Sequence, residues 1–198
     1  MELPPPAPDS IAPLLDRVTG SREVELEWVD LLAQMEYVGF RKIAKAVPYD
    51  RVSLETLRHV SEEASHAYLL KAAAERNGLA ERSWKEGLFS EAGWRYFEGL
   101  DRGVEAAVPD RALCYPLVAV AVERRVLALY SAYLERTAIA DVRKAVERIL
   151  AQERAHARLF DGRGLPGADV EAACRLEDRL WGGFVEEALR LVPSTVRL

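Results

Sequence analysis

The chain has 198 residues, of which 49% are hydrophobic and 30% are charged. This composition predicts one soluble globular domain with a sizeable core, and it excludes a disordered or fibrous chain. The net charge of -5 does not favour nucleic acid as a partner, because nucleic-acid-binding proteins usually present a basic surface.

Residues 1–20 contain the Pro-rich segment MELPPPAPDS and predict a flexible tail ahead of a single domain over 21–198. The tail lacks the basic and apolar regions of a signal peptide, and no window of the chain approaches the ~20 apolar residues of a membrane span. Cys114 and Cys174 lie in apolar helical contexts and form no CxxC pair. We therefore expect two buried free thiols, no membrane association and a reducing, cytoplasmic location.

Helical periodicity begins after this tail. Apolar residues recur at steps of three and four from residue 23 to 46, which predicts the first long helix. A proline-containing break at 47–50 precedes a second long helix. Asp50 or Ser53 can cap this helix, and an Asn-Gly pair ends it near residue 76.

Residues 79–110 predict shorter helical pieces, because glycines interrupt the periodicity there. Ser83 and Glu86 are spaced as in a capping box, and Ser90 is expected to begin another turn or two. The aromatic residues of this segment predict that it packs on the core: Trp84, Trp94, Tyr96 and Phe97.

The rest of the chain predicts three more helices. The third long helix runs from about 117 to 136 with Pro116 in its first turn. The fourth begins between 137 and 141 and ends at 160, and a last amphipathic helix spans 169–191. No run alternates with period two, so the expected fold is all-α. Short loops predict two antiparallel helical hairpins, and the middle segment forms a long crossover between them.

Each of the four long helices places a glutamate on its apolar face, and two of these glutamates precede a histidine as ExxH. The i, i+3 spacing puts both side chains of an ExxH motif on one face of a helix. A buried carboxylate without a partner costs several kcal/mol, so four carboxylates and two imidazoles on core faces predict a shared cation. The candidate metal ligands are Glu36, Glu63, His66, Glu123, Glu153 and His156.

These six residues are expected at one level of the bundle. The midpoint between Glu36 and Glu63 falls in the first predicted turn, and the midpoint between Glu123 and Glu153 falls in the second. Residues equidistant from the turn of an antiparallel hairpin meet, and at ~1.5 Å per residue both pairs lie roughly 20 Å from their turns. The two hairpins can therefore bring all six side chains together.

The order Glu, ExxH, Glu, ExxH on four helices, with a long crossover after the second, resembles the ferritin-like di-iron carboxylate proteins over residues 23–160. The two symmetric ExxH motifs are more similar to bacterioferritins, rubrerythrins and small di-iron oxygenases than to ferritin. The chain lacks the Cys-rich knuckle of rubrerythrins. Its longer middle insert and its 169–191 helix depart from small bacterioferritins, and the insert is similar to the crossover of fatty-aldehyde deformylating oxygenases.

This resemblance implies a ferritin-like four-helix bundle with an additional C-terminal helix. It implies two iron ions, or manganese with iron, bridged by Glu63 and Glu153, with Glu36 and Glu123 as terminal ligands and one imidazole on each ion. The implied activity is that of an oxidoreductase, a small oxygenase or oxidase that activates dioxygen or peroxide on an unknown organic substrate. That substrate would lie in a channel beside the first two long helices. An external electron donor is implied, because no haem, flavin or nucleotide motif is visible.

Two other interpretations stay open. The first is iron handling, as a ferroxidase, a storage protein or a rubrerythrin-like protein that removes peroxide without an organic substrate. The second is a structural bundle in which both ExxH pairs are ordinary helix-surface contacts. A cage would favour storage, whereas a monomer or homodimer with an elongated apolar cavity would favour an oxygenase. The long insert and the single tail helix favour the monomer or homodimer.

Two further residues are candidates for a role in catalysis. His59 lies one turn before Glu63, where it can support a ligand or line a channel, although a satisfied polar group near the bundle end is the simpler interpretation. Tyr130 lies two turns after Glu123, where it can hydrogen-bond a ligand or supply a proton or electron, or act only as a core tyrosine.

Structural roles are expected for the other neighbours of these motifs. Glu62 is off the apolar face and is expected on the surface, and Arg124 and Arg125 are expected to pair with surface acids. Core or dimer contacts are expected from Met35, the aromatic residues at 94–97, and Leu176, Leu180, Phe184 and Leu189 of the tail helix.

Overall fold

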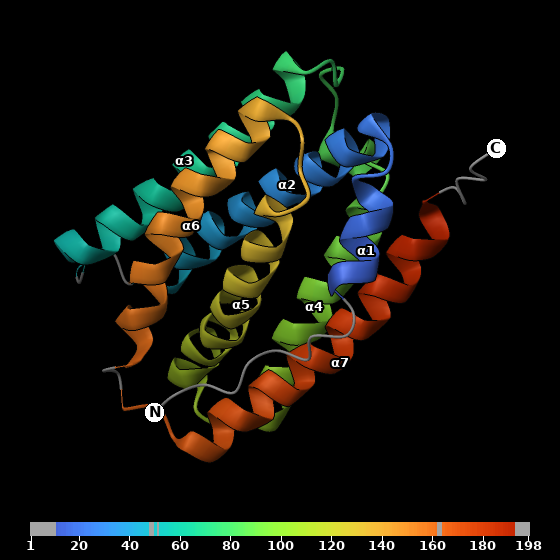
Figure 1. Ribbon diagram of the computed structural model, residues 1–198. Coiled ribbons are helices and arrows are strands. Elements are labelled where there is room, and N and C mark those ends of the chain that lie inside the picture. Colours follow the sequence, from blue (N-terminus) through green and yellow to red (C-terminus); the bar gives the residue numbers. More distant parts are fainter. Residues whose placement is uncertain (1–10, 48–49, 51, 162–163, 193–198) are drawn as a thin grey trace.

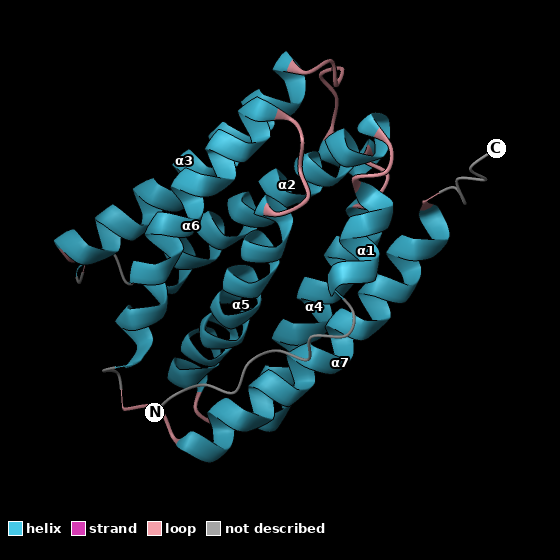
Figure 2. Cartoon of the chain, in the orientation of Figure 1, coloured by secondary structure: helices cyan, strands magenta, loops and turns pink. Residues whose placement is uncertain are grey.

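The computed structural model describes residues 11–47, 50, 52–161 and 164–192, and the side chains of 157–161 lie outside the described part. Within these residues the chain is all-helical, without strands, which confirms the all-α part of the predicted fold class (Figures 1 and 2). The helices are α1 (Ile11–Val18), α2 (Arg22–Ala46), α3 (Leu54–Arg76), a 3₁₀ helix η3 (Trp84–Glu86), α4 (Ser90–Ala107), α5 (Arg111–Leu134), α6 (Ala140–Asp161) and α7 (Gly167–Leu191).

Helices α3 and α6 lie side by side at one side of the molecule, and α1, α4 and α7 lie together at the other (Figure 1). Helices α2 and α5 run between these two sets. No helix in the described ranges combines the length and the hydropathy of a membrane-spanning segment.

Helix α1 contradicts the prediction of a flexible tail over residues 1–20, whereas residues 1–10 lie outside the described residues. Leu14, Leu15 and Val18 of this helix are completely buried. Arg17 Nη2 donates a hydrogen bond of 2.9 Å to the carbonyl of Val192, which ties α1 to the end of α7. The apolar spacing of α1 was helical, but the adjoining Pro-rich segment obscured it.

Helices α2 and α3 form the first predicted hairpin, with bounds within one residue of the prediction for α2 and at the end of α3. The hydroxyl of Ser21 accepts a backbone hydrogen bond at the start of α2, and Ser53 does the same at the start of α3. Arg22 at the start of α2 donates to Asn77 at the end of α3 at 2.8 Å, so the two helices are antiparallel.

The prediction of shorter pieces over 79–110 is wrong for its second half, which forms the 18-residue helix α4. The capping box of Ser83 and Glu86 is confirmed, on η3. The glycines of α4 serve close packing: a Cβ at Gly93 would lie 2.6 Å from Leu31 on α2, and one at Gly103 would lie 2.5 Å from Leu176 on α7. These glycines therefore allow α4 to approach its neighbours instead of ending the helix.

Helices α5 and α6 form the second predicted hairpin. Helix α5 begins at Arg111, capped by Asp110, so Pro116 lies in its second turn and the prediction of a start near residue 117 with Pro116 in the first turn is wrong. The N-terminal end of α6 meets the C-terminal end of α3, where Asn77 Nδ2 donates to Asp141 Oδ2 at 3.3 Å. Helices α3 and α6 are therefore antiparallel neighbours.

The core residues expected from the sequence are largely confirmed. Cys114 and Cys174 are free and buried. The apolar residues of the α7 stripe are buried or pack against the core. The aromatic segment of α4 is divided, because Tyr96 and Phe97 are buried whereas Trp94 is 58% exposed.

The expectation that Arg124 and Arg125 pair with surface acids is confirmed only in part, because both contact the partly exposed Asp178 at 2.6 Å but also pair with a buried acid. Both arginines are buried, and both donate to Glu177 of α7, which is itself fully buried. Arg125 Nε lies 2.8 Å from Glu177 Oε1, and the hydroxyl of Tyr96 donates to the same oxygen at 2.8 Å. This buried ion cluster connects α4 and α7 to the segment of α5 that carries Glu123, and removing one member would leave buried charges without compensation.

Candidate metal centre

The structure brings all six predicted ligands together, in two overlapping groups of donor atoms. Within each group the donor atoms all lie within 4.8 Å of one another. The three-carboxylate group consists of Glu36, Glu63, His66 and Glu153, and the two-histidine group consists of His59, Glu63, Glu123 and His156. Glu63 belongs to both groups, so the groups are adjacent. Metal binding by these residues stays a prediction.

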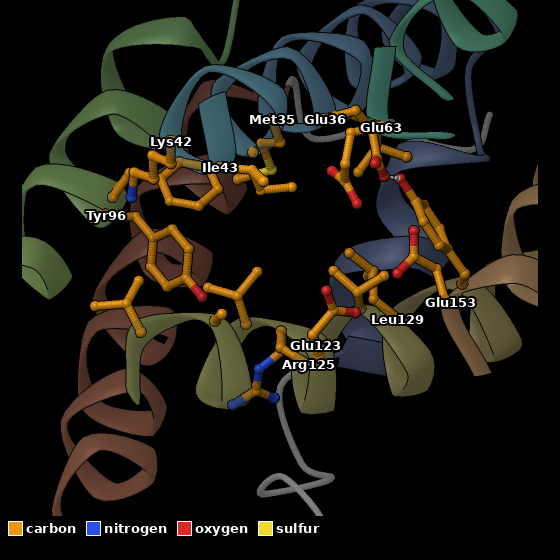
Figure 3. Close-up of a pocket in the computed structure, with 18 of the residues that line it drawn as sticks. Met35, Glu36, Lys42, Ile43, Glu63, Tyr96, Glu123, Arg125, Leu129 and Glu153 are labelled. Atoms are coloured by element: carbon orange, nitrogen blue, oxygen red, sulfur yellow. Dashed lines mark hydrogen bonds between the residues drawn. The ribbon is translucent and has the colours of Figure 1, made fainter. Parts of the chain in front are cut away.

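Four helices supply these side chains. Helix α2 contributes Glu36, α5 contributes Glu123, and the two ExxH motifs come from the antiparallel helices α3 and α6. All seven residues are buried. The carboxylates of Glu36, Glu63, Glu123 and Glu153 point toward one another at one end of a cavity (Figure 3). The equal distances of these residues from the two hairpin turns therefore place them at one level, as the sequence predicted.

Glu153 lies between the two histidines of the ExxH motifs. Its Oε1 lies 2.9 Å from Nδ1 of His66, and its Oε2 lies 3.1 Å from Nδ1 of His156. Nδ1 of His66 also lies 3.2 Å from Oε2 of Glu36. Both imidazoles thus direct Nδ1 toward the carboxylates, and Glu153 has one oxygen for each of them.

The outward nitrogens of these histidines are held by two residues whose role the sequence analysis missed. His66 Nε2 lies 3.1 Å from Gln152 Oε1, and His156 Nε2 lies 2.8 Å from Glu62 Oε2. Gln152 Nε2 also donates to Glu62 Oε1 at 3.3 Å. The prediction that Glu62 lies on the surface is confirmed only in part, because its side chain is 22% exposed but its carboxylate contacts His156. Such outer partners orient imidazole ligands in metal sites.

The sequence contains a pattern that could have predicted the roles of Glu62 and Gln152. Glu62 and Gln152 each stand directly before the glutamate of an ExxH motif, so the two motifs share a longer frame of a polar residue, Glu, two variable residues and His. In the antiparallel pair of α3 and α6, the polar residue of one motif meets the histidine of the other. The repeated sequence pattern therefore predicts these two contacts once it is known that α3 and α6 are antiparallel neighbours.

The side chains of His59 and Tyr130 both contact candidate metal ligands, which a purely structural role would not require. His59 Nε2 lies 3.3 Å from Glu63 Oε1, among the donors of the two-histidine group, and not in an isolated polar contact at the bundle end. The hydroxyl of Tyr130 donates a hydrogen bond to Glu36 Oε1, so this buried core tyrosine also contacts a candidate ligand.

Burial and mutual repulsion make three of the four carboxylates of this centre hard to ionise. Burial, followed by the neighbouring carboxylates Glu36 and Glu153, raises the pKa of Glu63 well above its usual range. Burial and Glu153 likewise raise the pKa of Glu123. Burial is also the main cause of the raised pKa of Glu36. A cation bound between these groups would relieve the same repulsion that raises their pKa values.

Glu153 and the histidines behave in the opposite sense. Burial opposes the charge of Glu153, but hydrogen bonds from His156 and His66 outweigh it and lower the pKa of this carboxyl. Burial also opposes the charge of His66, but hydrogen bonds to Glu153 and Glu36 raise its pKa to about 11. Protons on the imidazoles therefore supply positive charge at the positions where a cation would lie.

The residues fit a pair of divalent cations on two further observations. Within the described residues, Glu123 Oε2 is buried without a hydrogen-bond partner. Gly39 provides the room for Glu63, because a Cβ at this position would lie 2.6 Å from Glu63 Oε2. Carboxylate and imidazole donors together suit divalent transition-metal ions.

A cavity adjoins the carboxylates. Its volume is about 80 Å³, so the space beside the carboxylates is small. Tyr96 and Lys42 lie at the end away from the carboxylates (Figure 3). Apolar side chains supply much of the wall: Leu32, Met35, Ile43, Val118, Val122 and Leu129.

Comparison with known proteins gave no match: no family model, no curated protein and no solved structure is significantly similar to the chain.

The thermal stability of the metal-free protein should fall as the pH rises from about 5 to about 9. The pKa values of five groups are raised above 4.5 for the carboxyls or 6.5 for the imidazoles: Glu36, Glu63, Glu123, His66 and His156. The folded state therefore retains protons that the unfolded chain releases, and this stabilisation is present at low pH and lost as the pH rises through the folded values. Glu153 opposes this trend only as the pH falls below its unfolded value of 4.5.

Melting curves followed by circular dichroism at several pH values would measure this effect. Added Zn²⁺ should raise the melting temperature more at high pH than at low pH, because it replaces the protons. Glu123→Gln should make the pH dependence of the metal-free protein less steep. A melting temperature that rises from acid to alkaline pH would contradict the described ionisation of the centre.

Gly39→Ala should weaken metal binding without harming the fold. The new Cβ would displace the flexible carboxylate of Glu63, whereas alanine in a helix is favoured over glycine by about 1 kcal/mol. We expect the free energy of unfolding of the metal-free protein to stay equal or rise, and the Zn²⁺ affinity to fall. Gly182→Ala in α7 is the matched control, because a Cβ at that position meets nothing within 4 Å. Equal Zn²⁺ affinities in both variants and wild type would show that Glu63 does not need this space.

Proposed function

We propose that this protein is a ferritin-like dinuclear oxidoreductase that uses dioxygen or peroxide to oxidise a small organic molecule. The metal would be iron, or manganese with iron. The observation that best supports the proposal is the pair of donor groups that share Glu63 and border a largely apolar cavity. The crossover of this family would correspond to the segment that contains η3 and α4.

Two redox-active ions would supply electron transfer to dioxygen or peroxide, which the protein residues cannot provide. Glu63 and Glu153 would bridge the two positions, because Glu63 belongs to both donor groups and Glu153 has one oxygen near each Nδ1. Gln152 and Glu62 would keep His66 and His156 in orientation through their outward nitrogens.

Tyr130 would hold a proton next to the centre. Its hydroxyl donates to Glu36 Oε1, and burial followed by the charge of Glu36 raises the pKa of this phenol well above its usual range. The phenol therefore stays protonated at neutral pH and keeps the Glu36 carboxylate oriented. A protonated donor at this position can also respond to charge that changes on Glu36 during a reaction.

The cavity favours an organic substrate over iron handling. Iron oxidation and storage need a path for ions, which polar side chains provide, whereas this cavity is lined largely by apolar side chains. At its outer end Lys42 Nζ lies 2.8 Å from Asp101 and 4.8 Å from the centre of the Phe97 ring. We propose a substrate that is mainly apolar and that lies with one end against the carboxylates. Electrons would come from an external donor in a reducing, cytoplasmic environment.

Glu63→Ala and Glu153→Ala should each abolish loading with two ions, because each removes a carboxylate placed to contact both positions. Metal analysis and optical spectroscopy after reconstitution with Fe²⁺ would measure the loss. Glu147→Ala on the exposed face of α6 is the control and should load like the wild type. Unchanged iron content in Glu63→Ala and Glu153→Ala, or no iron in the wild-type protein, would support the structural bundle instead.

Ala119→Phe would separate an oxygenase from an iron-handling protein. Ala119 lines the cavity, so the larger side chain should obstruct the substrate while leaving every candidate ligand in place. We expect unchanged iron loading, but a loss of the dioxygen consumption that medium-chain aldehydes or simple aromatic compounds stimulate. Oxygen electrode measurements with a chemical reductant would test this. A cage-sized assembly whose Fe²⁺ oxidation is indifferent to these compounds and to Ala119→Phe would favour storage.

A further inference from the structure

We infer that His59 is a seventh metal ligand, through its Nε2 atom, and that the two ion positions are chemically unequal. This inference rests on the dinuclear centre of the proposed function. It adds a third imidazole to the six ligands expected from the sequence and assigns it to one position only.

The geometry of α3 directs His59 into the centre. His59 lies four residues before Glu63, which places both side chains on one face of the helix. Its side chain is buried, and its Nε2 lies 3.3 Å from Glu63 Oε1. The ring of His59 also lies against that of His156, with 4.2 Å between the ring centres. His59 is thus held between two residues that are themselves candidate ligands.

The donor atoms of His59, Glu63, Glu123 and His156 are close enough to share one cation, since all lie within 4.8 Å of one another. Nε2 of His59 lies 3.3 Å from Oε1 of Glu63, the residue that both donor groups share. An ion bound at Glu63, Glu123 and His156 would therefore find the imidazole of His59 as a fourth donor.

The two positions then differ in donor type, because only one of them has a second imidazole. The three-carboxylate group offers one imidazole, whereas the two-histidine group offers two imidazoles and two carboxylates. Carboxylates suit manganese and other hard ions, and imidazoles favour Fe²⁺, Co²⁺ and Zn²⁺. We expect the two-histidine position to take Zn²⁺ or Co²⁺ first and the three-carboxylate position to accept Mn²⁺ more readily. The centre is therefore suited to two different ions.

The cavity distinguishes His59 from the other two histidines. His59 lines the cavity together with Glu63 and Glu123, whereas His66 and His156 are not among its lining residues. The two-histidine position therefore has a ligand that molecules in the cavity can reach. A small molecule added to the solution can therefore be used to replace the side chain of His59 and not those of the other two histidines.

Nitrogen NMR of the wild-type protein tests the inference directly. The chain has only three histidines, so the spectrum of protein labelled with ¹⁵N-histidine is simple. With two equivalents of Zn²⁺, we expect metal-bound signals from Nδ1 of His66, Nδ1 of His156 and Nε2 of His59. With one equivalent, the signals of His59 and His156 should change before that of His66. Zn²⁺ bound to His66 and His156 while both nitrogens of His59 stay metal-free would overturn the inference.

Variants then assign the ions to the two positions. We would titrate each protein with Co²⁺ and follow the absorption. His59→Ala should lower the affinity for one of the two ions by roughly tenfold or more and leave the affinity for the other within about twofold of wild type. His66→Ala should weaken the other ion instead. Both ions bound by His59→Ala with wild-type affinities would refute the role of His59, while the dinuclear centre itself would stand. No Co²⁺ or Zn²⁺ bound by the wild type would refute the centre and the inference together.

Rescue by free imidazole distinguishes the loss of a ligand from the loss of the folded structure. His59→Gly leaves a space at the cavity wall that free imidazole can enter, and added imidazole should restore the weakened ion. His66→Gly, whose side chain does not line the cavity, is the control and should not respond. Circular dichroism should show unchanged helix content in both variants. If imidazole has no effect on a folded His59→Gly protein, the side chain does not act as a replaceable ligand.

Discussion

Four carboxylates share one small volume inside this protein, and their mutual repulsion is the constraint on which the arrangement of the bundle depends. Glu36, Glu63, Glu123 and Glu153 come from four different helices and are all buried. Such a group is tolerated only if protons or cations compensate it. In the structure the imidazoles of His66 and His156 lie against Glu153 with raised pKa values, and the pKa values of three of the carboxyls are raised as well. Two cations would replace these protons and satisfy every one of these groups at once.

The additional helices hold the buried carboxylates and histidines in place. Glu177 of α7 binds the arginines that follow Glu123, so α7 anchors the ligand segment of α5 from behind. Helix α4 packs closely against α2 and α7 through its glycines and adds Tyr96 and Phe97 to the cavity. Helix α1 closes the core against α5 and α7. The helices outside the two hairpins thus support the helices that carry the candidate ligands and form part of the cavity wall.

The centre is close to symmetric in its outer contacts and asymmetric within. Glu62 and Gln152 hold the histidine of the opposite helix in equivalent ways. Tyr130 contacts Glu36 in the three-carboxylate group, whereas His59 belongs to the two-histidine group. A symmetric frame therefore carries two positions with different donors. This difference would let the protein assign different tasks, or different ions, to the two positions.

The sequence by itself determined the helical class, the bounds of α2 and the end of α3, and the six residues of the two ExxH motifs and their companion glutamates. It could do so because 3.6-residue periodicity and i, i+3 spacing are local, and because equal distances from a turn bring residues of an antiparallel hairpin to one level. Only the tertiary structure decided that Arg124 and Arg125 are buried against α7 and that α1 belongs to the core. It also decided that Glu62 and Gln152 each contact the histidine of the opposite helix, and that His59 contacts Glu63. The spacing of residues shows which side chains share a face of their own helix, but it does not show which neighbouring helix that face will meet.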